Sequence, residues 1–154
     1  MLVIAGVICV GVLLAGVQVK RVRDRKELEQ HSVTPEELHT LFEAKQDVAL
    51  FDVRLPLDLL SNLVVIPGAT RISPEEVITN PSLIPRDRDS IVYCTCPGEE
   101  TSRAILHKAR ALGFQRIKFL KGGLAGWQAK GFPVEPYDKP FHLSSGTNLA
   151  GIKG

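Results

Sequence analysis

The chain has 154 residues, 44% of them hydrophobic, which is enough for one domain with a buried core. Its 19 basic and 17 acidic residues are unevenly spread: residues 20–31 hold five of the basic and three of the acidic ones, which leaves 14 of each sign from residue 32 onward. Because nucleic-acid binding draws most of its affinity from a basic surface, this neutral domain excludes nucleic acid as a partner.

The first 17 residues, MLVIAGVICVGVLLAGV, contain no charged or strongly polar side chain. As a helix they would extend about 25 Å, against the roughly 30 Å of a hydrocarbon core, and Val19 with the stems of the next basic residues lengthens the run. A cleaved signal peptide has basic residues before its apolar run, whereas here they follow it. These flanking charges also disfavour the alternative of a buried core helix. We therefore predict a transmembrane anchor helix over residues 1–19, with a lipid bilayer as its partner.

A basic segment, residues 20–31, follows the apolar run. Its basic residues are Lys20, Arg21, Arg23, Arg25 and Lys26. Basic residues beside a membrane helix stay on the cytoplasmic side and favour anionic lipid head groups. We therefore expect a juxtamembrane linker over residues 20–31 of a single-pass protein, with the soluble domain in the cytoplasm.

The next element begins at residues 34–37, Thr-Pro-Glu-Glu, which combine a capping box with a proline in the first turn. They predict a helix that runs to about residue 44 and has Leu38, Leu41 and Phe42 on its apolar face. Ser-Pro-Glu-Glu at residues 73–76 repeats the signal and predicts the start of another helix.

Two strands are predicted between these helix starts. Residues 48–53, VALFDV, form a near-continuous apolar run, which is typical of a parallel strand covered on both sides. Asp52 and Arg54 emerge at the carboxyl end of this strand. Pro67 and Gly68 then mark a turn, after which residues 70–72 predict a short strand.

The central unit of the chain is a strand, a loop and a helix. Residues 91–95 are apolar, β-branched and aromatic, which predicts a buried strand. From Thr101 the apolar residues follow a helical period, and Gly113 is placed to end that helix in a left-handed cap. The loop between them begins at Cys96. Backbone N–H groups and the helix dipole at such a loop favour a thiolate, so this cysteine is a candidate nucleophile, with a half-buried structural thiol as the alternative.

The last predicted elements are a strand at residues 117–120 and a helix that begins after Gly122 and Gly123 and carries Trp127. Residues 138–154 are rich in Gly and Ser and predict a flexible C-terminal tail. Because strands alternate with helices, the predicted class is α/β, with a mostly parallel sheet and helices on both faces. Ligands bind beyond the carboxyl ends of such strands, where the cysteine loop and the Asp52–Arg54 segment both lie.

Four segments, in this order, resemble the rhodanese (sulfurtransferase) domain: residues 51–54, 66–69, the strand that ends in the cysteine loop, and 122–133. The resemblance covers residues 32–137. It implies the rhodanese-like fold, with a five-stranded, mostly parallel sheet, and a catalytic cysteine that takes sulfane sulfur from a donor as a persulfide and passes it to a thiol or protein acceptor. No cofactor is implied. The loop CTCPGEETS resembles the loop of rhodanese modules attached to bacterial inner-membrane segments. We therefore expect this protein at the bacterial inner membrane.

The resemblance also distinguishes between the two neighbouring cysteines. Cys96 stands 17 residues before Gly113, which matches the family spacing without a gap, and Ser102 falls where the family has Ser or Thr. We therefore assign the catalytic sulfur to Cys96 and expect Cys94 to be buried packing, with a resolving thiol as the alternative. The remaining residues of the predicted active-site loop are Pro97, Gly98, Glu99, Glu100, Thr101 and Ser102.

The loop departs from the family pattern in its charge. Thr101 stands where the family commonly has Arg, and Glu99 and Glu100 place two carboxylates near the sulfur. Such charges repel thiosulfate and cyanide, which predicts weak transfer between these two anions and favours a protein persulfide, a polysulfide or a thiol partner. The alternative for the glutamates is that they face water at the helix start, where the dipole favours them.

The sequence also bears on other sites and other functions. Asp52 and Arg54 are candidate supporting residues, and a strand-end pair that orders the neighbouring loops is favoured over contact with substrate. Cysteines and histidines without ligand spacing predict no metal site. A cysteine phosphatase or an arsenate reductase would need an arginine that binds the substrate oxyanion at a spacing from Cys96 that this sequence does not have, so both activities are disfavoured. The alternative that stays open is a catalytically weak or inactive module that binds a partner protein at the membrane.

Overall fold

The structure is a computed structural model that describes residues 2–95 and 107–139; within these, the side chains of residues 2–13, 24, 28 and 78 lie outside the description. The strands are β1 (Ser32–Val33), β2 (Val48–Asp52), β3 (Val64–Val65), β4 (Thr70–Arg71), β5 (Asp89–Tyr93), β6 (Ile117–Leu120) and β7 (Glu135–Pro136). The helices are α1 (Leu2–Gln30), α2 (Pro35–Glu43), α3 (Pro56–Ser61), α4 (Pro74–Thr79), the 3-10 helix η1 (Pro81–Leu83) and α6 (Gly123–Ala129), and residues 107–111 are also helical.

Five strands form one sheet in the order β1-β6-β5-β2-β4, and each neighbouring pair is parallel. The central strand is β5, in which Ile91 pairs with Leu50 of β2 and Val92 pairs with Phe119 of β6. This confirms the predicted five-stranded parallel sheet. A second, two-stranded antiparallel sheet joins β3 to β7, far apart in the sequence, and was not predicted.

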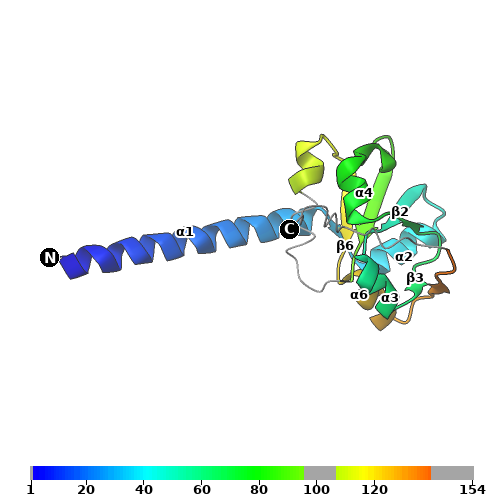
Figure 1. The fold of residues 1–154 in the computed structure, drawn as a ribbon, viewed down its shortest axis with the longest axis horizontal. Coiled ribbons are helices and arrows are strands. Elements are labelled where there is room, and N and C mark those ends of the chain that lie inside the picture. Colours follow the sequence, from blue (N-terminus) through cyan, green and yellow to red (C-terminus); the bar gives the residue numbers. More distant parts are fainter. Residues whose placement is uncertain (1, 96–106, 140–154) are drawn as a thin grey trace, which may run out of the picture.

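The hydrophobic core has two parts, one on each face of the sheet. Successive residues of β5 alternate between them, because side chains of a strand point to opposite faces: Val92 belongs to one cluster, and Ile91 and Tyr93 to the other. The first cluster also holds Ala109 from the helical residues 107–111, with Val77 of α4 packed against it, and the second holds side chains of α2 and α6 that include Leu38 and Trp127. Helices therefore cover both faces, as predicted (Figure 1).

The local helix signals act as the sequence predicts. Thr34 and Ser73 each accept a hydrogen bond from the backbone N–H three residues later, and the glutamate at that position accepts one from the cap residue, so both capping boxes are present. Gly113 has φ +81°, and the N–H of Phe114 donates to the carbonyl of Ala109 over 3.0 Å. This left-handed cap ends the helix before β6. By contrast, α3 was not predicted, because its N-cap, Leu55, makes no side-chain cap bond.

Helix α1 projects from the α/β part of the molecule (Figure 1). It leads directly into β1, and Glu27 near its end forms an ion pair with Arg110. The apolar side chains of Leu14, Val17 and Val19 are exposed. Where side chains are described, the structure contains no helix both long and apolar enough to cross a membrane. The predicted anchor lies mostly within residues 1–13, outside that description, and most of the predicted tail, residues 140–154, also lies outside the described residues.

Candidate active site

The carboxyl edge of the sheet is organised around the ends of β2 and β5. Asp52 and Tyr93, the last residues of these strands, pair in register, and the N–H of Val53 donates to the carbonyl of Tyr93 over 2.9 Å. The chain then continues through Cys94 and Thr95 toward the predicted loop. The structure thus brings the Asp52–Arg54 segment and the residues before the cysteine loop to one place, as expected from two neighbouring parallel strands.

The predicted loop itself falls outside the described residues. It comprises Cys96, Pro97, Gly98, Glu99, Glu100, Thr101 and Ser102. Their assigned roles therefore stay predictions, and the site is described by the residues that lead into the loop and by those that hold its base.

Cys94 is buried, with 8% of its surface exposed, and belongs to the hydrophobic cluster that includes Phe51 and Val92. Its carbonyl oxygen accepts a hydrogen bond of 3.2 Å from the N–H of Leu124 in α6. The start of α6 therefore holds the chain two residues before Cys96. Burial in this cluster agrees with the packing role expected of Cys94.

Thr95, which separates the two cysteines, has an unusual environment. Its side-chain oxygen Oγ1 is buried, and among the described residues it has no hydrogen-bond partner. Most buried polar atoms in folded proteins are hydrogen-bonded, because an unpaired one loses its bonds to water without replacement. No local sequence pattern marks this residue, because the partners of a threonine after a buried strand depend on the tertiary surroundings.

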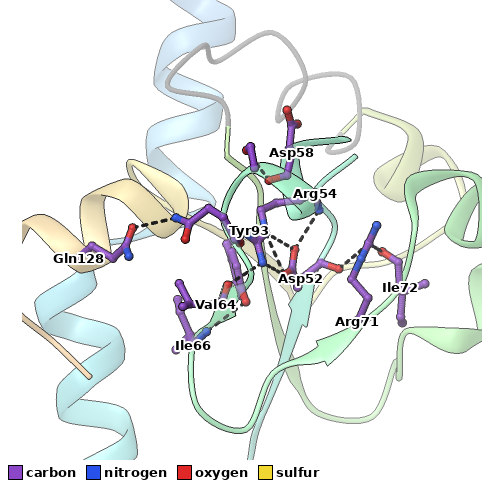
Figure 2. A network of polar contacts seen from close by, with 11 residues as sticks. Asp52, Arg54, Asp58, Val64, Ile66, Arg71, Ile72, Tyr93 and Gln128 are labelled. Atoms are coloured by element: carbon purple, nitrogen blue, oxygen red, sulfur yellow. Dashed lines mark hydrogen bonds and ion pairs between the residues drawn. The ribbon is translucent and has the colours of Figure 1, made fainter. Parts of the chain in front are cut away.

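Asp52 and Arg54 form a fully buried ion pair (Figure 2). The Arg54 guanidinium donates to both carboxylate oxygens, and Nη2 lies 2.6 Å from Oδ2 of Asp52. Its remaining bonds go to the backbone carbonyls of Asn62, over 2.9 Å, and Val64, over 2.7 Å. The pair thus connects the end of β2 to the segment between α3 and β3, which favours the interpretation that it orders neighbouring loops.

Tyr93 extends this network to β5, a role that was not predicted from the sequence. Its hydroxyl oxygen accepts a hydrogen bond of 3.2 Å from the N–H of Ile66, which lies on the second of the segments that carry the family resemblance. Burial, and then the Asp52 carboxylate, raise the pKa of the Tyr93 phenol above its usual range, because both disfavour a second negative charge. The available signal was a tyrosine directly after the apolar residues Ile91 and Val92, since a buried tyrosine hydroxyl usually has a partner.

Arg71, at the end of β4, completes the described polar contacts at this edge (Figure 2). Its Nη1 donates to the carbonyls of Asp52, over 3.0 Å, and Ile72, over 2.7 Å. The described arginines here are therefore bonded to a carboxylate or to backbone oxygens. Within the described part of the chain, no group of three or more His, Cys, Asp and Glu side chains could hold a metal ion.

Comparisons with known proteins agree on one family. The family model described as a rhodanese-like domain matches residues 34–130. A sulfurtransferase from Allochromatium vinosum is 30% identical over 89 residues, which cover 58% of this chain and 79% of that protein. A probable adenylyltransferase/sulfurtransferase from Mycobacterium tuberculosis is 31% identical over 62% of this chain, but the match spans only 24% of that longer protein.

Solved structures show the same fold. The crystal structure of an Anabaena protein is 29% identical and covers 68% of this chain and 82% of that one, with a TM-score of 0.58. A full-length protein from Lactobacillus plantarum is 20% identical and covers 77% of this chain and 98% of that one, with a TM-score of 0.63. The similar proteins include sulfurtransferases. The family match over residues 34–130 and the five-stranded parallel sheet show that the chain belongs to the rhodanese-like domain family.

Proposed function

We propose that the protein is a membrane-anchored sulfurtransferase that carries sulfane sulfur as a persulfide on Cys96. The observation that carries the proposal is the family match over residues 34–130, a range that includes Cys96, together with the 30% identity over 89 residues to a sulfurtransferase. The described structure supports it, because β5 ends at the carboxyl edge of the sheet three residues before Cys96, and the N–H of Leu124 in α6 holds the next residue, Cys94.

The proposed reaction has two balanced steps. The Cys96 thiolate attacks the outer sulfur of a donor persulfide, so that an S–S bond to Cys96 forms while the donor's S–S bond breaks, and the donor leaves as a thiolate with the electron pair. An acceptor thiolate then attacks the outer sulfur on Cys96, and Cys96 leaves as a thiolate. No external oxidant or reductant is required, because the zero-valent sulfur changes carrier without a net change in oxidation state.

The charge of the loop sequence selects among donors and acceptors. Glu99 and Glu100 follow Cys96 closely, and Thr101 replaces the arginine that the family commonly has. These carboxylates repel small anions such as thiosulfate and cyanide. A protein persulfide or a polysulfide is therefore the proposed donor, and a protein or small-molecule thiol is the proposed acceptor.

The proposed location is the bacterial inner membrane, with residues 1–19 as anchor, residues 20–31 as linker and the catalytic domain in the cytoplasm. The first 17 residues are uncharged, and basic residues follow them. In the described part of α1, Leu14, Val17, Val19 and Val22 expose their apolar side chains, and such a surface favours a lipid or protein partner over water.

Intact mass spectrometry of the full chain tests the catalytic proposal. After incubation with glutathione persulfide or polysulfide, the wild type should gain about 32 Da, the mass of one sulfur, and lose it on addition of a thiol. Cys96→Ser should gain nothing, whereas Cys94→Ser should still be loaded. If no donor loads the wild type, the sulfurtransferase proposal is wrong, and the second reading, a module that binds a partner protein, replaces it.

Membrane attachment is tested separately. The full chain should sediment with the membrane fraction and resist extraction at high salt, and a chain that begins at residue 20 should be released. A C-terminal reporter active only in the cytoplasm should be active. A full chain that remains in the supernatant would exclude the anchor without affecting the persulfide experiment.

A further inference from the structure

We propose that an exposed apolar surface around α3 is the docking site for the protein that exchanges sulfur with this domain, and that this partner presents apolar side chains beside a lysine or an arginine. We call it the α3 leucine surface, and it consists of Leu55, Leu57, Leu60 and Leu63. The inference rests on the proposed function for the partner's role as sulfur donor or acceptor. The surface itself is built from described residues that neither the family match nor the cysteine loop assigns to any role.

The first argument is the concentration of exposed leucines. Leu57 is 74% exposed, and the other three leucines are 43–54% exposed. Since α3 has six residues and is about 9 Å long, side chains on the helix and at its two ends lie close together. Among the described residues 32–139, the other exposed large apolar side chains are Leu83 and Val134, which lie far apart in the sequence. A cluster of this kind is typical of an interaction site.

The second argument is that the α3 leucine surface is held in place from beneath. Leu59 of α3 is fully buried, and the carbonyl of Asn62 at the helix end accepts a hydrogen bond of 2.9 Å from Nη1 of Arg54. The Asn62 side chain also donates to Oε1 of Gln128 in α6 over 3.3 Å (Figure 2). A surface that is ordered before its partner arrives loses less conformational entropy on binding.

The third argument is the place of this surface in the fold. Helix α3 begins four residues after Asp52, the end of β2, and Asp52 pairs in register with Tyr93, the end of β5. It is also bonded through Asn62 to α6, the helix that holds Cys94 at the carboxyl edge of the sheet. Helix α1 leads into the opposite, amino end of β1. The α3 leucine surface is therefore at the catalytic edge, away from the edge at which the proposed anchor enters, and this favours a protein partner over the bilayer.

The size and charge of the surface indicate what kind of protein it fits. The four leucines expose on the order of 400 Å², about half of the roughly 800 Å² that each side of a stable interface buries. This is too little to hold a second copy permanently, and it fits a partner that binds and leaves, as sulfur exchange requires. Asp58 is the one charged residue from position 55 to 63, so a cation beside the apolar side chains of the partner complements the surface.

Peptide binding to the full chain in phosphatidylcholine nanodiscs tests the proposal. The probe is a fluorescent, helical peptide of leucine and lysine, read by anisotropy with empty discs as the blank. We expect the double variant Leu57→Ser, Leu60→Ser to bind it about tenfold more weakly or worse, because two leucine contacts are lost. Leu83→Ser, which removes an exposed leucine elsewhere, is the matched control and should stay within about twofold of the wild type.

A second peptide, with glutamate in place of lysine, tests the charge. It should bind the wild type at least about threefold more weakly than the lysine peptide, and Asp58→Asn should reduce this difference. The Tm of the double variant should lie within about 4 °C of the wild type, since both side chains are exposed. If that variant does not fold, the two peptides with the wild type and Asp58→Asn still decide the proposal.

Four outcomes would overturn the proposal. Two are an unchanged affinity in the double variant and equal binding of the two peptides by the wild type. The third is a wild-type dimer in detergent, seen by sedimentation, that the double variant loses, because it would assign the surface to a second copy. The fourth is labelling of residues 55–63 by a photoactivatable phosphatidylcholine in the discs, which would assign the surface to the bilayer. None of these measurements needs sulfur on Cys96, so a failure of persulfide loading would reject the proposed function alone.

Discussion

Gly123 lies so close to Cys94 that a Cβ atom on the glycine would stand 1.9 Å from the Cys94 carbonyl oxygen. The same oxygen accepts the hydrogen bond from the N–H of Leu124. The backbone of α6 therefore packs directly on the end of β5, two residues before Cys96. Only a residue without a side chain permits this approach, and the φ of +54° at Gly123 also favours glycine.

Substitution of Gly123 by alanine should show how much the contact with Cys94 costs in addition to the unfavourable φ. Gly123→Ala combines an unfavourable φ with the contact to Cys94 and should lower the free energy of unfolding by about 3 kcal/mol or more. Gly131→Ala is the matched control, because Gly131 has φ +71° but nothing within 4 Å of a Cβ, and should cost about 1 kcal/mol. Urea unfolding of both variants measures the difference. Equal losses would show that the close approach to Cys94 contributes nothing.

The buried ion pair should be far more sensitive than the exposed ones. Arg54→Met leaves the Asp52 carboxylate buried without its cation and should lower the free energy of unfolding by about 3–5 kcal/mol. Arg116→Gln is the control: it removes a pair with Asp89 whose side chains are 53% and 42% exposed, and should cost less than about 1 kcal/mol. Chemical denaturation tests both. A loss for Arg54→Met no larger than that for Arg116→Gln would contradict this prediction.

Tyr93 should make the domain sensitive to alkaline pH. Since burial raises the pKa of its phenol above the unfolded value of 10.0, the folded protein binds this proton more tightly than the unfolded chain does. The resulting stability is complete below about pH 10 and declines above it, by at most about 1.4 kcal/mol for each pH unit.

Tyr93→Phe tests this dependence. The variant should lose about 1–2 kcal/mol at pH 8, because the N–H of Ile66 loses its acceptor, and the deficit should shrink as the pH rises from 10 to 11. Urea unfolding at pH 8, 10 and 11 gives the comparison. Parallel curves for the variant and the wild type would show that Tyr93 does not contribute to alkaline unfolding.

The capping box of α4 should contribute a smaller, local stabilisation. Ser73→Ala removes the side-chain oxygen that accepts from the N–H of Glu76 and should cost about 1 kcal/mol, whereas Ser73→Thr should be nearly neutral. Hydrogen bonds from Ser73, first from its backbone N–H and then from its side chain, lower the pKa of Glu76, so this part of the stability is present above about pH 4.5 and is lost as the pH falls through the lowered pKa. Ser73→Ala keeps the backbone bond and removes the side-chain one, so thermal unfolding at pH 7 and pH 3 should show a smaller Ser73→Ala effect at the lower pH.

Several elements could be predicted because their causes lie within a few residues. The capping boxes at Thr34 and Ser73 act within one helical turn, and Gly113 ends its helix through its own backbone conformation. The apolar run of β2 indicates a strand with both faces covered. These local signals, in their order along the chain, were sufficient for the α/β class, the parallel sheet and the family resemblance.

The tertiary structure decided what depends on contacts between distant residues. The register of Asp52 with Tyr93, the approach of Gly123 to Cys94 and the pairing of β3 with β7 join segments that no local pattern connects. The buried hydroxyl of Thr95, which has no hydrogen-bond partner among the described residues, belongs to the same group, since burial and partners are properties of the surroundings. Short-range hydrogen bonds and periodicity are encoded in the sequence by itself, whereas burial and long-range pairing exist only after the sheet and its covering helices have packed together.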